Sequence, residues 1–414
     1  MKRGPIAVLR EQPLLRVYFL GQAISLIGAW MQAVAQSWVV ASLTASTAAI
    51  ATVSFVGSLP MLALSMPAGV IADRHDRRRI LILTQLGFAA LAFLFAGLSH
   101  AGMLSLPWLY ALAILMSTVL AFDLPAMQAF IPELVPPQRI PDAIALNQTL
   151  MHGTRLIGPA LAGALMAATS PAMAFVANGV SYFAVIASLL RIKVPPRPAH
   201  ERRAGGGLRE AFAYLKEQPT VRALMGFTAL STTFVFPLFV IFSAIFIKDV
   251  LHGTSRDFGL FMSASGFGAM TGALMLLRVS AEQRGRLILM ASAVTATLLL
   301  LQSFSRSVVP AALVQVFLTF SISIGMGLSS TIVQVMVPSR MRGRIMGLNA
   351  LGFTGIMPSA ALILGAIGDH IGLRAVMRLS AIAYGAIAIP WLISAGLWQP
   401  VAHHPPETVG STHA

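Results

Sequence analysis

Apolar segments of about 20 residues recur along the whole chain, and short polar links separate them. A hydrocarbon core about 30 Å thick requires helices of roughly this length. The pattern therefore predicts an all-α membrane protein. We place twelve transmembrane helices in the 414 residues, at 17–40, 48–71, 80–98, 106–127, 144–168, 171–192, 221–247, 257–277, 286–304, 308–334, 345–368 and 372–396.

The basic residues are distributed unequally between the links. Of the 29 lysines and arginines, 23 share a side with the N-terminus and five lie on the other side, while Arg155 falls inside a span. Because cytoplasmic links are enriched in lysine and arginine, both termini are predicted to be cytoplasmic. The net charge of +15 then reflects topology and does not indicate a nucleic-acid partner.

The composition narrows the chemistry further. Only 10% of the residues are charged and 57% are hydrophobic, whereas soluble domains carry about a quarter charged residues. The absence of cysteine excludes disulfides and thiolate metal sites, and no P-loop motif is present. We expect no metal, no other cofactor and no enzymatic activity. The expected partners are the lipid bilayer, a small-molecule substrate and protons, with the chain acting as a monomer.

A segment rich in proline, glycine and charge divides the chain at 193–218. Its first part breaks helices, whereas 208–216 favours a short amphipathic helix on the membrane surface. We predict an N-terminal six-helix bundle at 1–192, a cytoplasmic linker at 193–218, a C-terminal six-helix bundle at 219–398 and a disordered cytoplasmic tail at 399–414.

Two short patterns recur at nearly constant spacing. LREQP at 9–13 returns as LKEQP at 215–219, 206 residues later. Val-Pro followed ten residues later by Leu-Asn occurs at 135–147 and again at 337–349, an offset of 202. These positions are equivalent in two halves, which favours duplication. Two such halves around a site near the membrane midplane are typical of alternating-access carriers.

The link at 69–79 reads GVIADRHDRRR and carries six ionised side chains, so it must lie at the membrane surface. A glycine followed four residues later by Asp-Arg, and then by further arginines, resembles the signature link between helices 2 and 3 of the major facilitator superfamily. Asp76 stands where most members have a second glycine, which predicts a stiffer turn or a different closure. The matching residues are Gly69, Asp73, Arg74, Arg77 and Arg78.

In that superfamily the link is a cytoplasmic latch that joins the two halves when the cavity faces outward. The resemblance implies that Asp73 caps the N-terminal end of helix 11 near 343–347, where the helix dipole attracts an anion. It also implies that Gly69 lets helix backbones approach closely and that Arg77 reaches Asp123 in helix 4. The alternative is that the arginines only anchor the topology.

Asp123 and Arg155 are ionised residues inside predicted spans, where a charge costs at least about 2.5–3.5 kcal/mol. Asp123 either pairs with Arg77 or contacts substrate, and both roles are compatible with carrying a proton. Arg155 always keeps its charge and needs a partner, for which Asp123, a ligand anion, Gln32 and Gln36 are candidates.

His152 lies one turn from Arg155 and is a second candidate for proton coupling, because histidine is the residue type whose charge ordinarily changes near neutral pH. Residues 155–163 read RLIGPALAG and resemble the antiporter motif in helix 5 of exporters, with Ala162 in place of one glycine. Its proline kinks the helix and its glycines permit close packing, which either seals against proton leak or only aids packing. The motif residues are Arg155, Gly158, Pro159 and Gly163.

In the major facilitator fold, helices 1, 4, 7 and 10 line the central cavity. Neutral polar, aromatic and methionine side chains on these helices suit a bulky amphiphile, and the lack of an acidic residue midway along helix 1 or 7 disfavours a cationic cargo. Together with Arg155, the candidates for the cavity are Trp30, Gln32, Gln36, Met116, Thr118, Ser231, Phe234, Gln315 and Thr319.

The order of features along nearly the whole chain resembles the secretion-effector branch of the superfamily, which includes the enterobactin exporter. This resemblance implies proton-driven export of a siderophore or drug-like amphiphile across the bacterial inner membrane. A nutrient importer or uniporter of the same fold is the alternative, and a membrane sensor without transport is a third reading. The segments that carry the resemblance are 21–22, 30–32, 67–69, 73–74, 125–128, 131–134, 145–147 and 158–159.

Overall fold

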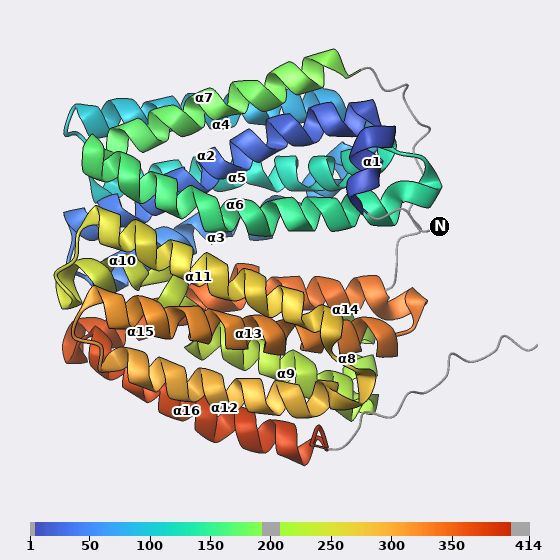
Figure 1. The fold of residues 1–414 in the computed structure, drawn as a ribbon, viewed down its shortest axis with the longest axis vertical. Helices are drawn as coiled ribbons and strands as arrows, with labels where there is room; N and C mark the ends of the chain where they lie inside the picture. The colour runs from blue at the N-terminus through green and yellow to red at the C-terminus, as the bar shows by residue number, and fades with distance from the viewer. Residues whose placement is uncertain (1–4, 193–207, 399–414) are drawn as a thin grey trace, which may run out of the picture.

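The computed structural model describes residues 5–192 and 208–398, and these residues form helices and connecting turns without a strand. Eleven helical segments in this part of the chain are long and apolar enough to cross a membrane. They correspond to eleven of the twelve predicted spans. The remaining predicted span is the 29-residue helix α6, which carries several polar residues and lies beside the others in Figure 1.

The first part of the chain contains α1 (Pro5–Glu11), α2 (Pro13–Leu43), α3 (Thr47–Arg74), α4 (Arg77–His100), α5 (Leu106–Phe130), α6 (Ile140–Ala168) and α7 (Pro171–Arg191). The second part contains α8 (Leu208–Glu217), α9 (Pro219–Phe234), α10 (Ser243–Ile245), α11 (Ser255–Met275), α12 (Arg284–Ser303), α13 (Val308–Met336), α14 (Ser339–Leu351), α15 (Met357–Ile371) and α16 (Leu373–Ser394). The short helix predicted at 208–216 is confirmed as α8. The predicted tail at 399–414 and most of the predicted linker lie outside the described residues.

Proline starts several of these helices and also interrupts one of them. Pro13, Pro171 and Pro219 occupy the first turn, where the missing amide hydrogen has no helical partner to lose. Pro237 instead begins a π-helical turn, Pro237–Ile241, so the span predicted at 221–247 is broken after α9. The span predicted at 345–368 remains one helical segment, Met341–Ile371, in which a π-helical turn, Gly352–Ile356, joins α14 to α15. Apolar periodicity alone did not predict either π-helical turn.

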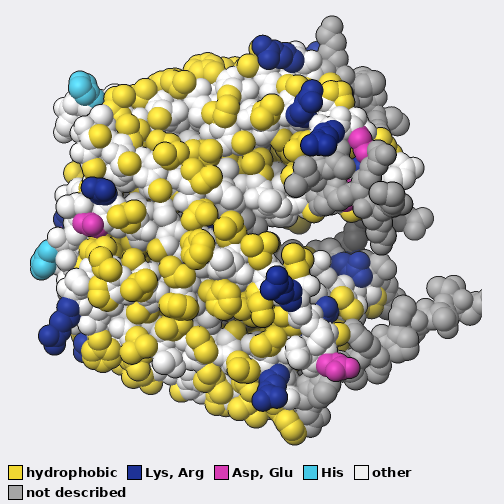
Figure 2. All heavy atoms as spheres, in the orientation of Figure 1, with side chains coloured by type: hydrophobic (Ala, Val, Ile, Leu, Met, Phe, Trp, Pro, Cys, Tyr) yellow, Lys and Arg dark blue, Asp and Glu magenta, His cyan; other side chains and the backbone are white. Residues whose placement is uncertain are grey.

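The helices run side by side along one direction, with α2 to α7 on one side of Figure 1 and α9 to α16 on the other. The turns therefore gather at two ends. We call the end with α1, α8 and the α3–α4 turn the arginine end, and the other the opposite end. Hydrophobic side chains cover the middle of the face in Figure 2, and most of its lysines and arginines lie toward the arginine end.

The two parts of the chain meet through α6 with α11 and through α3 with α15. At the first contact, the rings of Trp38 in α2 and Phe258 in α11 also stack, with centroids 5.9 Å apart. At the second contact, Thr47 near the start of α3 reaches Gly365 and Asp369 in α15. Because Thr47 and Asp369 lie beside chain turns at the opposite end, the second contact joins the two parts there.

Candidate functional site

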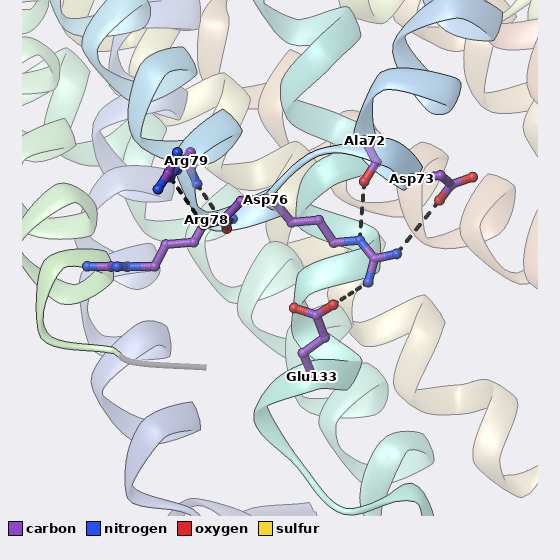
Figure 3. A network of polar contacts seen from close by, with 7 residues as sticks. Ala72, Asp73, Asp76, Arg78, Arg79 and Glu133 are labelled. Atoms are coloured by element: carbon purple, nitrogen blue, oxygen red, sulfur yellow. Dashed lines mark hydrogen bonds and ion pairs between the residues drawn. The ribbon is translucent and has the colours of Figure 1, made fainter. Parts of the chain in front are cut away.

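The α3–α4 turn is closed by Asp76, the residue that departs from the family pattern. Its carboxylate accepts hydrogen bonds from the backbone amides of Arg78 at 2.9 Å and Arg79 at 3.4 Å, which caps the start of α4 (Figure 3). The backbone amide of His75 donates to the carbonyl of Ile71 at 3.0 Å and completes the last turn of α3. A side-chain cap thus closes the turn at the position where most family members have a glycine.

Arg77 is the centre of a polar network, and its partners Ala72, Asp73 and Glu133 are labelled in Figure 3. Its guanidinium forms an ion pair with Glu133, lies 3.8 Å from the Asp73 carboxylate and donates to the carbonyl of Ala72 at 3.3 Å. The predicted pair between Arg77 and Asp123 is therefore wrong, because a nearer carboxylate occupies the guanidinium. Glu133 lies in the short 3-10 turn after α5, at 131–134. Residues 131–134 carry part of the family resemblance, but their sequence pattern does not predict an ion pair for Glu133.

Arg78 connects the same turn to α7 by hydrogen bonds. Its guanidinium donates to the backbone carbonyls of Leu189 at 2.6 Å and Leu190 at 3.1 Å. These carbonyls belong to the last turn of α7, where the helix dipole favours a cation. Arg74 ends α3 and is exposed. The arginines of this turn therefore have different roles, and those of Arg77 and Arg78 are structural within the first part of the chain.

The cap predicted between Asp73 and the start of helix 11 is not formed in this structure. Within the described part of the chain, Asp73 forms its ion pair with Arg77 in its own turn. A Cβ built on Gly69, Gly343 or Gly347 would have no neighbouring atom within 4 Å. The predicted close approach at Gly69 is therefore absent as well. In the part of the chain that the structure describes, Gly69 of this turn and Gly343 and Gly347 of α14 thus have no close neighbour across the arginine end.

Asp123 in α5 is buried and receives two hydrogen bonds from α4. The Thr84 hydroxyl donates at 2.5 Å and the Gln85 amide at 3.0 Å, both to one carboxylate oxygen. Neutral donors thus replace the cation that was predicted as its partner. Thr84 and Gln85 are adjacent polar residues in an otherwise apolar span, and this was the available signal for a polar contact inside the membrane.

Arg155 has an aromatic partner. Its guanidinium carbon lies 5.4 Å from the centroid of the Trp30 ring, which is a cation–π contact of about 0.5–2 kcal/mol. No carboxylate of the described residues lies within ion-pair distance of it, so Asp123, one of its candidate partners, is not paired with it in this structure. Gln32 is not its partner either, because its side-chain oxygen accepts from Asn178 at 2.7 Å. The side chain of His152 lies outside the described residues.

The helix-5 motif packs α6 against two neighbours. A Cβ built on Gly158 would lie 2.5 Å from the Cβ of Trp30 in α2, and one built on Gly163 would lie 2.8 Å from the Cα of Gly259 in α11. A Cβ on Gly259 would in turn lie 2.7 Å from the carbonyl oxygen of Pro159. Gly158 therefore allows close packing of α6 on α2 within the first part of the chain, whereas Gly163 and Gly259 allow close contact between the two parts. Gly259 was not predicted, since nothing in its own segment matches a motif.

Most of the predicted cavity residues are packed between helices. Gln315 and Thr319 in α13 are fully buried, and Ser231 in α9 bonds to the hydroxyl of Tyr384 at 3.2 Å. Gln32 is also buried, and its amide lies 4.0 Å from the sulfur of Met116. The Thr118 hydroxyl bonds back to its own helix. Trp30 and Gln36 are half-buried.

An apolar cavity of about 700 Å³ lies between α3, α9 and α15. Of the predicted cavity residues, Phe234 lines it. The other lining residues are Leu62, Thr233, Leu351, Gly355, Ile356, Ser359, Ala360, Ile363, Leu364 and Ile367. Leu62 is the lining residue from the first part of the chain, and the others belong to the second part. Five of them lie on α15, a helix that was not among the predicted cavity helices.

The apolar helices and the charged turn define a membrane transporter of the major facilitator superfamily. A bacterial homologue of the human lysosomal transporter Spinster, solved in an inward-facing and occupied conformation, has the same fold with a TM-score of 0.72. It is 16% identical, and the match covers 94% of this chain and 97% of that chain. The chain matches the transmembrane secretion effector family over residues 3–397 and belongs to it.

Named exporters are among the curated relatives. The Enterobactin exporter EntS of Citrobacter koseri is 26% identical over 399 residues, covering 94% of this chain and 92% of that protein. Macrolide efflux protein A of Streptococcus pyogenes is 26% identical over 384 residues, covering 89% of this chain and 93% of that protein. The chain is therefore similar to siderophore and macrolide exporters over most of its length.

The contact between Gly163 and Gly259 predicts a position-specific effect of alanine. Gly163→Ala should lower the unfolding free energy by about 1–3 kcal/mol, because the added methyl group meets backbone atoms of α11. Gly153→Ala in the same helix is the control, since its Cβ has no neighbour within 4 Å, and it should be neutral or stabilising by up to about 1 kcal/mol. Unfolding of the purified protein in detergent measures both, and equal effects would refute the contact.

The network at Arg77 predicts a measurable coupling with Glu133. The side chains are only 22% and 14% exposed, so a double-mutant cycle with Arg77→Ala and Glu133→Ala should give about 0.5–3 kcal/mol of coupling. The pair of Asp76 and Arg79 is 51% and 84% exposed and should give less than about 1 kcal/mol. Unfolding in detergent provides both cycles, and similar coupling in the two pairs would contradict the prediction.

Proposed function

We propose that this protein is a twelve-helix exporter that moves amphipathic small molecules out across the bacterial inner membrane by alternating access and proton antiport. In this proposal α6 is the twelfth span, because 29 residues at about 1.5 Å each exceed a 30 Å hydrocarbon core. Residues 1–192 and 219–398 form the two halves, 193–218 links them, and the chain works as a monomer. The bias of basic residues supports a cytoplasmic arginine end.

The contacts between the halves carry the proposal. Asp369 of α15 bonds to the start of α3 at the opposite end, whereas at the arginine end Asp73 stays within its own turn. Such an arrangement supports a conformation in which the space between the halves is accessible from the cytoplasm. In the outward-facing conformation, the residues Gly69, Asp73, Arg74, Arg77 and Arg78 would then join the first half to α14 as the cytoplasmic latch.

The surroundings of Arg155 support a cargo with an acidic or strongly electronegative group. The guanidinium has an aromatic ring beside it and no carboxylate, so an anionic group of a ligand would complete the pairing that the membrane interior demands. The apolar cavity at Phe234 suits the hydrophobic part of the same molecule. Relatives named for enterobactin export and macrolide efflux support siderophores and drug-like amphiphiles as the classes to test.

Asp123 and His152 are the proposed proton carriers. Asp123 is 7% exposed and is bonded to neutral donors instead of a cation, so neither protonation state is excluded by a fixed salt bridge. Exchange of a proton at this carboxylate would change its hydrogen bonds with Thr84 and Gln85. Since both donors lie on α4, the exchange would alter how α4 and α5 pack.

Transport into everted vesicles tests the cargo and its driving force. Vesicles that contain the protein should accumulate enterobactin or a macrolide when a pH gradient is imposed, and dissipating the gradient should stop the uptake. Arg155→Gln should reduce uptake of an anionic cargo by about tenfold or more, because a charged hydrogen bond is lost. Arg306→Gln at the exposed surface is the control. Uphill uptake without the gradient would contradict proton antiport.

The proposed cytoplasmic latch predicts that Asp73→Ala favours the conformation open at the arginine end. The chain has no cysteine, so Ser359→Cys supplies a single thiol in the cavity at Phe234. Its labelling by an impermeant maleimide in everted vesicles should increase with Asp73→Ala. Glu282→Ala, an exposed carboxylate near the start of α12, should leave the labelling unchanged. Unchanged labelling with Asp73→Ala would refute the latch.

A further inference from the structure

Asp369 makes the most extensive polar contact between the two halves. Its carboxylate accepts from the hydroxyls of Ser46 at 2.6 Å and Thr47 at 2.8 Å, and from the backbone amides of Thr47 at 2.6 Å and Ala48 at 3.4 Å. All four donors belong to the N-terminal end of α3. A side chain near the end of α15 therefore caps a helix that lies more than 300 residues earlier in the chain.

The backbones approach closely at this cap. The Thr47 hydroxyl oxygen also lies 2.6 Å from the carbonyl oxygen of Gly365, so its single hydrogen is shared between this carbonyl and the Asp369 carboxylate. A Cβ on Gly365 would lie 2.7 Å from the Thr47 carbonyl oxygen, and a Cβ on Gly368 would lie 2.6 Å from the Thr47 hydroxyl. Gly372 then ends α15 with φ +82°, a conformation that suits glycine. This surface is thus shaped for α3 and is incompatible with larger residues.

The position of Asp369 is unfavourable within its own helix. It lies two residues before the end of α15 at Ile371, where the helix dipole contributes partial negative charge. The N-terminus of α3 offers the opposite partial charge together with unpaired amide hydrogens. The carboxylate is therefore stabilised by α3 and not by α15, so its favourable energy depends on the two halves being together at this end.

The same arrangement occurs at the end of α3. Residues 69–73 read GVIAD and residues 365–369 read GAIGD, and each aspartate lies in the last turn of its helix. Asp73 ends α3 at the arginine end, and Asp369 ends α15 at the opposite end. The family resemblance implies that Asp73 of helix 2 (α3) caps the start of helix 11 (α14 and α15). Asp369 makes the reciprocal contact, from the end of helix 11 to the start of helix 2.

We propose that Asp369 is a second latch, which closes the opposite end and must release the N-terminus of α3 before cargo can leave there. The proposal rests on the alternating access proposed above. Asp369 acts here as a positioning residue and contacts no cargo. The Asp73 cap and the Asp369 cap would both join α3 to the helix formed by α14 and α15, one at each end. When these helices separate at one end they approach at the other, so the two latches alternate.

Labelling of a single buried thiol tests this latch without any cargo. Ala51 is fully buried one turn along α3 from Thr47, so Ala51→Cys in the otherwise cysteine-free chain reports opening of the opposite end. An impermeant maleimide is applied to right-side-out vesicles. Asp369→Ala should increase the labelling rate by about tenfold, since it removes a charged hydrogen-bond acceptor. Asp369→Asn keeps an acceptor oxygen and should increase it less, whereas Asp73→Ala should not increase it.

Asp257→Ala is the matched control. Asp257 also caps a helix N-terminus at the opposite end, with bonds to the Thr254 amide at 2.8 Å and hydroxyl at 2.7 Å, but both residues belong to one half. Equal labelling of the Asp257 and Asp369 variants, or no increase with either Asp369 variant, would overturn the proposal. If Asp369→Ala does not fold, Asp369→Asn decides. If labelling increases but neither enterobactin nor a macrolide is transported, the latch stands and the proposed cargo is wrong.

Discussion

The constraint on which this structure depends is the cost of an ionised side chain that lacks compensation inside a membrane. Arg77, Asp123 and Arg155 are compensated in three different ways. Arg77 is held at the surface by Glu133, and Asp123 is bonded to neutral donors of the adjacent helix. Arg155 has only the face of Trp30 among the described residues. It is therefore the least compensated of these three charges, and in the proposed function an anionic group of the cargo completes its pairing.

Contact between the two parts of the chain is governed by a second constraint, the shape of the backbone surface. Within a membrane, helices associate through close packing and polar contacts, because lipid is as apolar as a leucine side chain. Gly163 meets Gly259 at one interface, and Gly365 and Gly368 meet Thr47 at the other. Where no side chain separates the backbones, a shift of α3 relative to α15 breaks many contacts together. Such an interface favours two discrete arrangements over a continuous range.

The sequence predicted the features that follow from local pattern. The length of the apolar segments predicted twelve spans, and eleven of them correspond to helical segments long and apolar enough to cross a membrane. The amphipathic pattern predicted α8. The prediction was wrong where the answer depends on a partner distant in sequence. Arg77 pairs with Glu133 and not with Asp123, because the turn after α5 places Glu133 beside the guanidinium. The spacing of residues along the sequence does not predict how that turn folds. The buried state of Gln315 had the same cause, since periodicity identifies a face but not the neighbour that covers it.

The reciprocal positions of Asp73 and Asp369 bear on how a transporter keeps two conformations close in free energy. A carboxylate at a helix N-terminus contributes about 0.3–1 kcal/mol, or more when it is partly buried. If each conformation satisfies one such carboxylate and leaves the other at the unfavourable end of its own helix, the two contributions nearly cancel. A difference of a few kcal/mol in the binding of cargo or protons is then enough to select either conformation. Similar capping at both ends therefore favours reversible switching, which a single strong latch would oppose.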